Sequence, residues 1–277
     1  MPAVKVDVPQ ELSRPAGRRR RQWKPQDVWN YTLQAASVGI FFATGVAVTL
    51  VAPVVRLVLG PERSLPVGRA LIRGLFRFFS WWLEAVGLCR IRFEGVEKLA
   101  SLRGVIVAPN HPGLLDAVFL IPHLPRAVCI MRAGLMRNPS FLGAAGLAGY
   151  ITNDRGPDLI RQCERKLAAG DNLLIFPEGT RTRLHARAVN PFKGGFALAA
   201  VLTGAPIQTV LIARSGSYLA KETSLGAVAE VPVRITIRVG EVFHARSGES
   251  AKALAARLEE YFRASLENSG GEIRLAH

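Results

Sequence analysis

A run without a single charged side chain, from Val28 to Val55, constrains this chain more than any other feature of its sequence. A helix crosses the hydrocarbon core of a bilayer with roughly 20 apolar residues, so the run is long enough to enter a membrane. Trp29 and Tyr31 stand near its start, and such aromatic rings favour the headgroup level. A buried core helix and a cleaved signal peptide are alternatives, but the run is long for both and no clean cleavage site follows it.

The segments on either side of this run are basic. Residues 1–27 are polar and include the arginine run Arg18 to Arg21, a composition typical of a disordered basic arm. On the other side, Arg69, Arg73 and Arg77 recur every four residues and would form one stripe on a helix, beside a face of aromatic and aliphatic side chains. Such a helix either lies in the headgroup plane or packs on the rest of the protein, and both can hold together.

Positive charge on both flanks decides the expected topology. Basic residues gather on the cytoplasmic side of membrane segments, so a single crossing would leave one basic flank on the wrong side. Pro53 offers a bend within the run. We therefore expect residues 28–87 to form a membrane-associated helical hairpin that enters one leaflet and returns, in preference to a single crossing.

From residue 88 onward, short apolar runs alternate with helical patterns. The expected strands are 88–95, 104–109, 127–131, 150–152, 172–176, 206–213 and 233–240, and the expected helices are 112–121, 134–147, 157–169, a helix after Lys193, and 251–266. This alternation predicts an α/β domain over 88–277 with a mixed, largely parallel sheet flanked by helices. Ligand sites in such sheets form at the carboxyl ends of strands. The small residues of 134–149 suit either an acyl-chain tunnel or close packing.

Two residues after the strand expected at 104–109 can form a general base. Pro112 suits the first position of a helix, which would place His111 at the helix start and Asp116 about one turn in. A carboxylate on one imidazole nitrogen fixes the tautomer and raises the basicity of the other. Because no serine or cysteine stands beside the pair, we expect the nucleophile to be a hydroxyl of the substrate. Taken alone, the pattern also fits a capping histidine with a solvated aspartate.

Cationic side chains follow the ends of several other expected strands. They are Arg155 in NDRG, Arg181 and Arg183 in FPEGTRTR, and Lys193 in NPFKGG. Arginine forks match phosphate oxygens, and free N–H groups at a helix start favour an anion. Glu178 stands in the second of these clusters, where it either orders the loop or orients a substrate hydroxyl. Each cluster alone fits a solvated turn, but together they predict a phosphate-bearing acceptor held near a base.

These clusters resemble the motifs of the glycerophospholipid acyltransferases, the family of 1-acyl-glycerol-3-phosphate acyltransferases and their relatives. The first motif, NHxxxxD, is matched by Asn110, His111 and Asp116, and the third, FPEGTR followed by Ser or Thr, by residues 176–182. The second is matched loosely, with Arg155 as the equivalent. The fourth keeps Pro206 but has Thr209 where a second proline is common. The resemblance covers about residues 80–240, and the first and third motifs together are highly specific.

The resemblance implies an O-acyltransferase. His111, oriented by Asp116, would take the proton of the acceptor hydroxyl, which attacks the thioester of an acyl-CoA or an acyl-carrier protein. No acyl-enzyme, metal or other cofactor is implied. The residues implied to bind substrate are Asn110, Arg155, Glu178, Gly179, Thr180, Arg181 and Lys193. Of these, Arg155, Arg181 and Lys193 would hold the acceptor phosphate, and a backbone N–H near Gly179 or the following helix start would stabilise the oxyanion.

The acceptor expected first is 1-acyl-glycerol-3-phosphate, with phosphatidic acid as product. A lyso-ornithine lipid, another lysolipid or a specialised lipid is the alternative, because the loosened second and fourth motifs lie where the acceptor and acyl chain would be recognised. A non-catalytic membrane lipid-binding protein is a more distant one. The net charge of +15 suits an anionic membrane surface and phosphate substrates, with acyl carrier protein as a further candidate partner.

We do not expect nucleic acid as a partner, because the aromatic residues gather in the apolar N-terminal segments and not among basic residues of a folded face. The expected location is the inner (cytoplasmic) membrane, with the catalytic domain facing the cytoplasm. His123 stands near the expected end of a helix, where a histidine suits the helix dipole, and His185 and His244 have no partner pattern. We expect these three and His277 to be structural or solvated.

Overall fold

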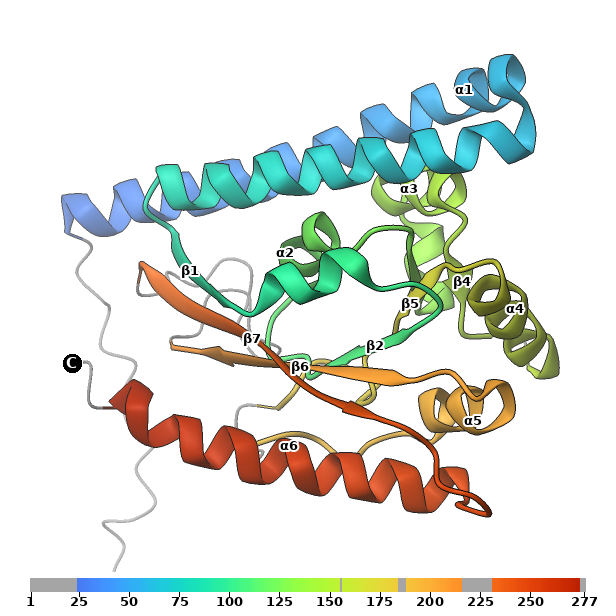
Figure 1. Cartoon of the computed structure of the whole chain (residues 1–277). Coiled ribbons are helices and arrows are strands. Elements are labelled where there is room, and N and C mark those ends of the chain that lie inside the picture. The colour runs from blue at the N-terminus through green and yellow to red at the C-terminus, as the bar shows by residue number, and fades with distance from the viewer. Residues whose placement is uncertain (1–23, 155, 184–187, 216–230, 275–277) are drawn as a thin grey trace, which may run out of the picture.

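The structure, a computed structural model, describes residues 24–154, 156–183, 188–215 and 231–274 (Figure 1). Most of the expected basic arm, as well as Arg155, His185 and His277, lies outside the described residues. The chain starts with α1 (Pro25–Ala85), which Figure 1 shows as two antiparallel arms side by side. The reversal is at Gly60, whose φ of 75° is a conformation that glycine adopts without strain. The predicted helical hairpin is present, and Pro53 lies inside its first arm.

Contacts between the two arms hold the hairpin together. The indole Nε1 of Trp82 donates to Oγ of Ser37 at 3.1 Å. Closer to the turn, the ring of Phe41 lies against those of Phe76 and Phe79, with centroids 6.3 and 5.1 Å apart. Among the described residues, α1 is the one helix long and apolar enough to cross a membrane. Large apolar side chains stay exposed on its outer side, among them Leu50, Val54, Leu57 and Val58.

The helix α3 (Pro139–Ala148) packs tightly against both arms. A Cβ on Gly143 would lie 2.2 Å from the Cα of Thr49, and one on Gly68 would lie 2.5 Å from the carbonyl oxygen of Leu147. The hydroxyl of Thr49 accepts a hydrogen bond from Gly143 N at 2.8 Å. Only residues without a side chain permit such an approach of two backbones. Of the two readings of residues 134–149, close packing is the one that this geometry supports.

Seven strands form one sheet. They are β1 (Cys89–Glu94), β2 (Ile106–Pro109), β3 (Ala127–Met131), β4 (Ile151–Thr152), β5 (Asn172–Leu174), β6 (Ile207–Arg214) and β7 (Val233–Phe243). Their spatial order is β1-β7-β6-β2-β5-β3-β4, and each neighbouring pair is parallel except β6 with β7. The mixed, largely parallel sheet predicted from the sequence is confirmed.

Helices cover both faces of this sheet. The remaining helices are α2 (Asp116–Leu120), α4 (Pro157–Ala168), α5 (Gly195–Thr203) and α6 (Ala251–Arg274), with short 3-10 turns at η2 (Val96–Ser101), η3 (Ile121–His123) and η4 (Ala133–Arg137). The hairpin and α2 lie over one face, and α6 lies over the other (Figure 1). The second arm of α1 buries Ile72, Phe79 and Leu83 in the same core as the strands. The division of the chain between residues 87 and 88 stays a prediction.

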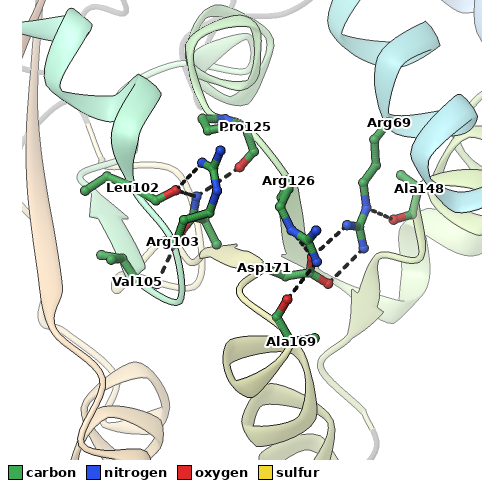
Figure 2. A network of polar contacts seen from close by, with 10 residues as sticks. Arg69, Leu102, Arg103, Val105, Pro125, Arg126, Ala148, Ala169 and Asp171 are labelled. Carbon is green, nitrogen blue, oxygen red and sulfur yellow. Dashed lines mark hydrogen bonds and ion pairs between the residues drawn. The ribbon is translucent and has the colours of Figure 1, made fainter.

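One of the stripe arginines faces the sheet instead of the headgroup plane. Arg69 donates to both carboxylate oxygens of Asp171, at 2.8 and 3.0 Å, and through Nε to the carbonyl of Ala148 (Figure 2). Its side chain is only 12% exposed. Farther along the arm, Arg77 donates to the carbonyl of Pro122 at 3.5 Å. For these two residues, the alternative of a helix packed on the protein is the one observed.

Candidate active site

The candidate site lies where three neighbouring parallel strands end. Asn110 and His111 follow β2, the loop with Glu178 follows β5, and Arg214 ends β6. Because β2 lies between β5 and β6 in the sheet, the three carboxyl ends meet at one edge.

His111 and Asp116 form a direct pair. The imidazole Nδ1 lies 2.8 Å from Oδ2 of Asp116, and the side chains are 19% and 4% exposed. The same oxygen accepts from the backbone N–H of Gly113 at 2.8 Å. On its other side, the imidazole stacks on the ring of Phe176, with centroids 4.0 Å apart. With Nδ1 engaged, Nε2 is the nitrogen left to act on a substrate.

The local backbone differs from the one predicted. Pro112 does not open a helix, because α2 begins at Asp116 and residues 112–115 form a tight loop. The prediction of a helix from Pro112 to Ile121 was wrong in its start for a physical reason. The carboxylate of Asp116 accepts from Gly113 N and bonds the His111 ring, which folds the loop back on itself.

Glu178 is a buried carboxylate whose two oxygens both accept from the protein. Oε1 accepts from His111 N at 2.9 Å and from the hydroxyl of Thr182 at 2.7 Å, and Oε2 accepts from Asn190 N at 2.9 Å. Its exposure is 1%. In return, Thr182 N donates to the carbonyl of His111 at 2.7 Å. The third motif therefore holds the backbone of His111 on both its N–H and its carbonyl side.

Asn110 and Asn190 also have structural partners. The Asn110 amide donates to Ile212 O at 2.8 Å and accepts from Ile212 N at 2.7 Å, so it extends the pairing of β2 with β6. Asn110 is 2% exposed. The Asn190 side chain donates to Arg181 O at 3.0 Å and accepts from Arg183 N at 3.3 Å. The Asn110 amide therefore joins the ends of β2 and β6, and the Asn190 amide holds Arg181 and Arg183 in the loop. For Asn110, this contact differs from the predicted contact with substrate.

The cationic side of the site comes from the loop after β5 and the start of α5. Gly179 has a φ of 62°, and a Cβ on it would lie 2.9 to 3.2 Å from the outer atoms of the Lys193 side chain. Lys193, which is exposed, therefore lies directly over Gly179. Thr180 and Arg181 follow in the same loop. The Gly179 N–H donates to Phe176 O at 3.0 Å, so the oxyanion role expected of this group is not supported.

Arg214 is a site residue that the sequence reasoning missed. Its Nη1 donates to the carbonyl of Pro112 at 3.3 Å, inside the loop that carries the His111 and Asp116 pair. Burial lowers the pKa of Arg214, whereas the nearby Asp116 carboxylate raises it. The available signal was its position, since it is the last residue of a strand that ends at the site edge.

Protein nucleophiles and metal ligands are scarce around the pair. Cys89 lines a pocket together with Asp116 and Arg214, but burial raises the pKa of its thiol to about 12. A thiol with that pKa stays protonated near neutral pH and is a poor nucleophile. Among the described residues, no group of three or more histidine, cysteine, aspartate or glutamate side chains is placed to hold a metal ion. The arrangement suits a base that activates a hydroxyl supplied by the substrate.

Comparisons with known proteins agree with this geometry. A protein-family model described as acyltransferase matches residues 90–213. A 1-acyl-sn-glycerol-3-phosphate acyltransferase of Pseudomonas aeruginosa is 27% identical over 193 residues, which are 68% of this chain and 72% of that protein. The protein of the same name from Helicobacter pylori is 31% identical over 137 residues, 46% of this chain and 57% of its own length.

A solved structure extends the likeness to most of the chain. The crystal structure of the 1-acyl-sn-glycerophosphate acyltransferase from Thermotoga maritima has a TM-score of 0.65 and covers 88% of this chain and 96% of its own. Its sequence is 20% identical, so this likeness shows a shared fold that includes the N-terminal helices.

Proposed function

Because this chain belongs to the glycerophospholipid acyltransferase family and is an O-acyltransferase, we propose that it transfers a fatty acyl group from a thioester to the hydroxyl of 1-acyl-sn-glycerol 3-phosphate, with phosphatidic acid as product. The observation that carries the proposal is the His111 and Asp116 pair, 2.8 Å apart at the carboxyl ends of the central strands. The names of the two relatives supply the acceptor.

In the proposed reaction, Nε2 of His111 removes the proton from the acceptor hydroxyl while Asp116 holds the Nδ1 side. The hydroxyl oxygen attacks the thioester carbonyl carbon and forms a tetrahedral intermediate. The intermediate collapses with cleavage of the carbon–sulfur bond, and the imidazolium returns its proton to the leaving thiolate. The acyl group goes directly to the acceptor, so no acyl-enzyme forms and no cofactor is needed beyond the acyl donor.

We assign the acceptor phosphate to Arg155, Arg181 and Lys193. Arg181 lies within the loop that holds His111, Lys193 lies over Gly179 of the same loop, and an arginine fork matches phosphate oxygens in a bidentate manner. Thr180 lies between Gly179 and Arg181 in that loop and is assigned to the same subsite. Glu178 and Asn110 act indirectly in this scheme, since their polar atoms bond the protein and hold the loop in place.

Membrane association is part of the proposal. The outer side of the hairpin exposes a continuous set of aliphatic side chains, whereas its inner side packs on α3 and the core of the sheet. A hairpin that lies along the sheet in this way can bury its outer side in one leaflet without crossing. We propose that the catalytic domain faces the cytoplasm at the inner membrane. A reporter fused after residue 65 should remain cytoplasmic, and a periplasmic signal would contradict this topology.

The activity is tested with purified protein in vesicles, labelled acyl donor and 1-acyl-glycerol-3-phosphate. His111→Ala should abolish transfer while vesicle binding is unchanged, because the base is lost and the hairpin is not. The matched control is His244→Ala, which removes an exposed imidazole away from the site. Activity of His111→Ala within tenfold of wild type would contradict the base assignment. A panel of other lysolipids, including lyso-ornithine lipid, tests the acceptor, and acyl-CoA in competition with acyl-carrier protein tests the donor.

A further inference from the structure

Arg214 lies next to the loop that carries the catalytic pair, where its Nη1 donates to the carbonyl of Pro112. It ends β6 and lines a pocket whose wall also includes Gly113, Asp116, Val233 and Ile235. A half-buried arginine beside apolar side chains is costly unless a nearby group compensates its charge.

Gly113 shows how closely Arg214 approaches Asp116. A Cβ on Gly113 would lie 2.8 Å from Nη1 of Arg214 and 2.9 Å from Oδ1 of Asp116. Both atoms therefore face the same small space above this glycine. Oδ2 of Asp116 is already occupied by His111 and Gly113 N, so Oδ1 is the oxygen on the arginine side. Asp116 thus lies between an imidazole on one oxygen and a guanidinium near the other.

This order of charges affects the base directly. An imidazole next to a carboxylate is easier to protonate, and a protonated imidazole cannot accept a proton from the acceptor. A positive charge within about 4–6 Å of the carboxylate offsets that effect. A fixed guanidinium beside Asp116 therefore opposes the effect of the carboxylate on the imidazole.

The other charged groups around the pair come from different elements. Arg181 is close enough to Arg214 to help lower its pKa, and Lys193 lies over Gly179. Glu178 lies behind the His111 backbone, where it bonds the N–H. Cys89, from β1, adjoins Arg214, and burial keeps its thiol protonated. Arg181 and Lys193 are placed to meet the acceptor phosphate, so their charge is compensated in the substrate complex, whereas that of Arg214 is directed at Asp116.

We propose that Arg214 is a positioning residue whose guanidinium lies beside Oδ1 of Asp116, holds that carboxylate against Nδ1 of His111 and offsets part of its charge. The inference rests on the proposed function of His111 as the base. It adds a member to the site that lies outside the first and third motifs. A side chain at residue 113 would have to move the outer atoms of Arg214 or Asp116.

The test is the pH dependence of kcat/KM for Arg214→Met and Arg214→Lys, with Arg234→Met as the matched control. Arg234 is an exposed arginine on the neighbouring β7, so its replacement removes the same charge from the surface. For Arg214→Met we expect a loss of roughly tenfold in kcat/KM at neutral pH and an acidic limb moved up by about 0.5–1 pH unit. For Arg214→Lys, the acidic limb should return most of the way to its wild-type position. For Arg234→Met, it should stay at the wild-type position.

The direction of the shift distinguishes this role from simple support of the fold. If Arg214 only packed the loop, its loss would loosen Asp116 from His111 and move the limb down or leave it unchanged, which would overturn the proposal. An NMR titration of the His111 ring gives the same answer without turnover. A midpoint equal in wild type and Arg214→Met refutes the role of Arg214, whereas full activity of His111→Ala refutes the proposed function. Gly113→Ala should shift the midpoint in the same direction as Arg214→Met, because its methyl group separates Arg214 from Asp116.

Discussion

The two ends of the central strands carry two buried polar networks of opposite character. At the amino ends, Asp171 precedes β5 and its carboxylate accepts from Arg69 at 2.8 and 3.0 Å and from Arg126 at 3.1 Å (Figure 2). At the carboxyl ends, the carboxylates of Asp116 and Glu178 are bonded by an imidazole, a hydroxyl and backbone N–H groups. The first network pairs charge with charge, and the second holds an imidazole with one nitrogen left for a substrate.

The amino-end network fastens distant parts of the chain to one another. Arg69 comes from the hairpin and also bonds Ala148 at the end of α3, while Arg126 bonds Ala169 after α4. Next to Asp171, the side chain of Asn172 bonds Val105 N, Leu102 O and Pro125 O. This end therefore fixes the N-terminal hairpin on the sheet, and the other end holds the His111 and Asp116 pair. Substitutions should separate the two tasks.

The largest effect is expected from Asp116→Asn at the carboxyl end. The amide keeps the size of the side chain but no longer selects the imidazole tautomer with its proton on Nδ1. We expect kcat/KM to fall by about 10²–10⁴-fold, with the melting temperature changed little. Steady-state kinetics and thermal unfolding of the same preparation measure the two quantities. If Asp116→Asn melted at a lower temperature but kept the wild-type kcat/KM when folded, Asp116 would support the fold and not the chemistry.

At the amino end, Asp171→Asn is expected to do the opposite. Removal of the carboxylate leaves Arg69, which is 12% exposed, without its ion partner and lowers the free energy of unfolding by about 3–5 kcal/mol. Activity per folded molecule should stay within a few-fold of wild type at low temperature. The matched control is Asp158→Asn, whose ion pair with Arg165 spans 3.9 Å between exposed side chains. Asp158→Asn should lower the free energy of unfolding by less than about 1 kcal/mol. Denaturant titration measures both variants, and equal losses of stability in the two would contradict the assignment of Asp171.

The two ends also differ in how far the sequence predicts them. The alternation of strands and helices, and the clusters that follow the strands, place His111, Glu178 and Lys193 at one edge, because parallel strands end together. The partner of Arg69 is 102 positions away in the chain, and periodicity along one helix carries no information on such a contact. That is why the sequence leaves open whether the stripe faces the headgroup plane or the rest of the protein.

The sequence also does not predict the local backbone and hydrogen bonds at the site. Pro112 carries a helix-start preference, but the side-chain bonds of Asp116 to Gly113 N and His111 outweigh that preference and form a loop. Asn110 was assigned to substrate because it belongs to the motif, whereas its amide extends the β2 and β6 pairing. Pattern predicts which residues gather at the edge, and only three-dimensional contacts separate those that face the substrate from those that hold the frame.

The Glu178→Gln variant tests whether every polar residue at the carboxyl end acts in the chemistry. Glu178 lies at that end, but its carboxylate holds the loop of His111 in place. The amide group of glutamine would meet donors, either His111 N and the Thr182 hydroxyl or Asn190 N, and one of these hydrogen bonds would be lost. We expect a loss of about 1–3 kcal/mol in stability together with roughly a tenfold fall in kcat. A large increase in KM for the acceptor with stability unchanged would instead identify Glu178 as a substrate ligand.

The smallest effect is expected on the pH dependence of stability, from His123 near the amino ends of the strands. His123 follows α2 close to the start of β3, and its ring lies on Phe93 with centroids 4.5 Å apart. Burial, and then the neighbouring Arg77, lowers the pKa of His123 below its ordinary value of 6.5. The unfolded chain then binds more protons than the folded one, so stability is complete above about pH 6.5 and falls as the pH drops through that value towards the folded pKa.

His123→Phe keeps the ring contact with Phe93 and removes the titrating group. Its melting temperature should fall less than that of wild type between about pH 7.5 and about pH 5, whereas the exposed His244→Gln should follow wild type. Thermal unfolding at matched ionic strength measures the difference between these curves. Identical pH dependence in wild type and His123→Phe would show that protonation of His123 does not contribute to the pH dependence of stability.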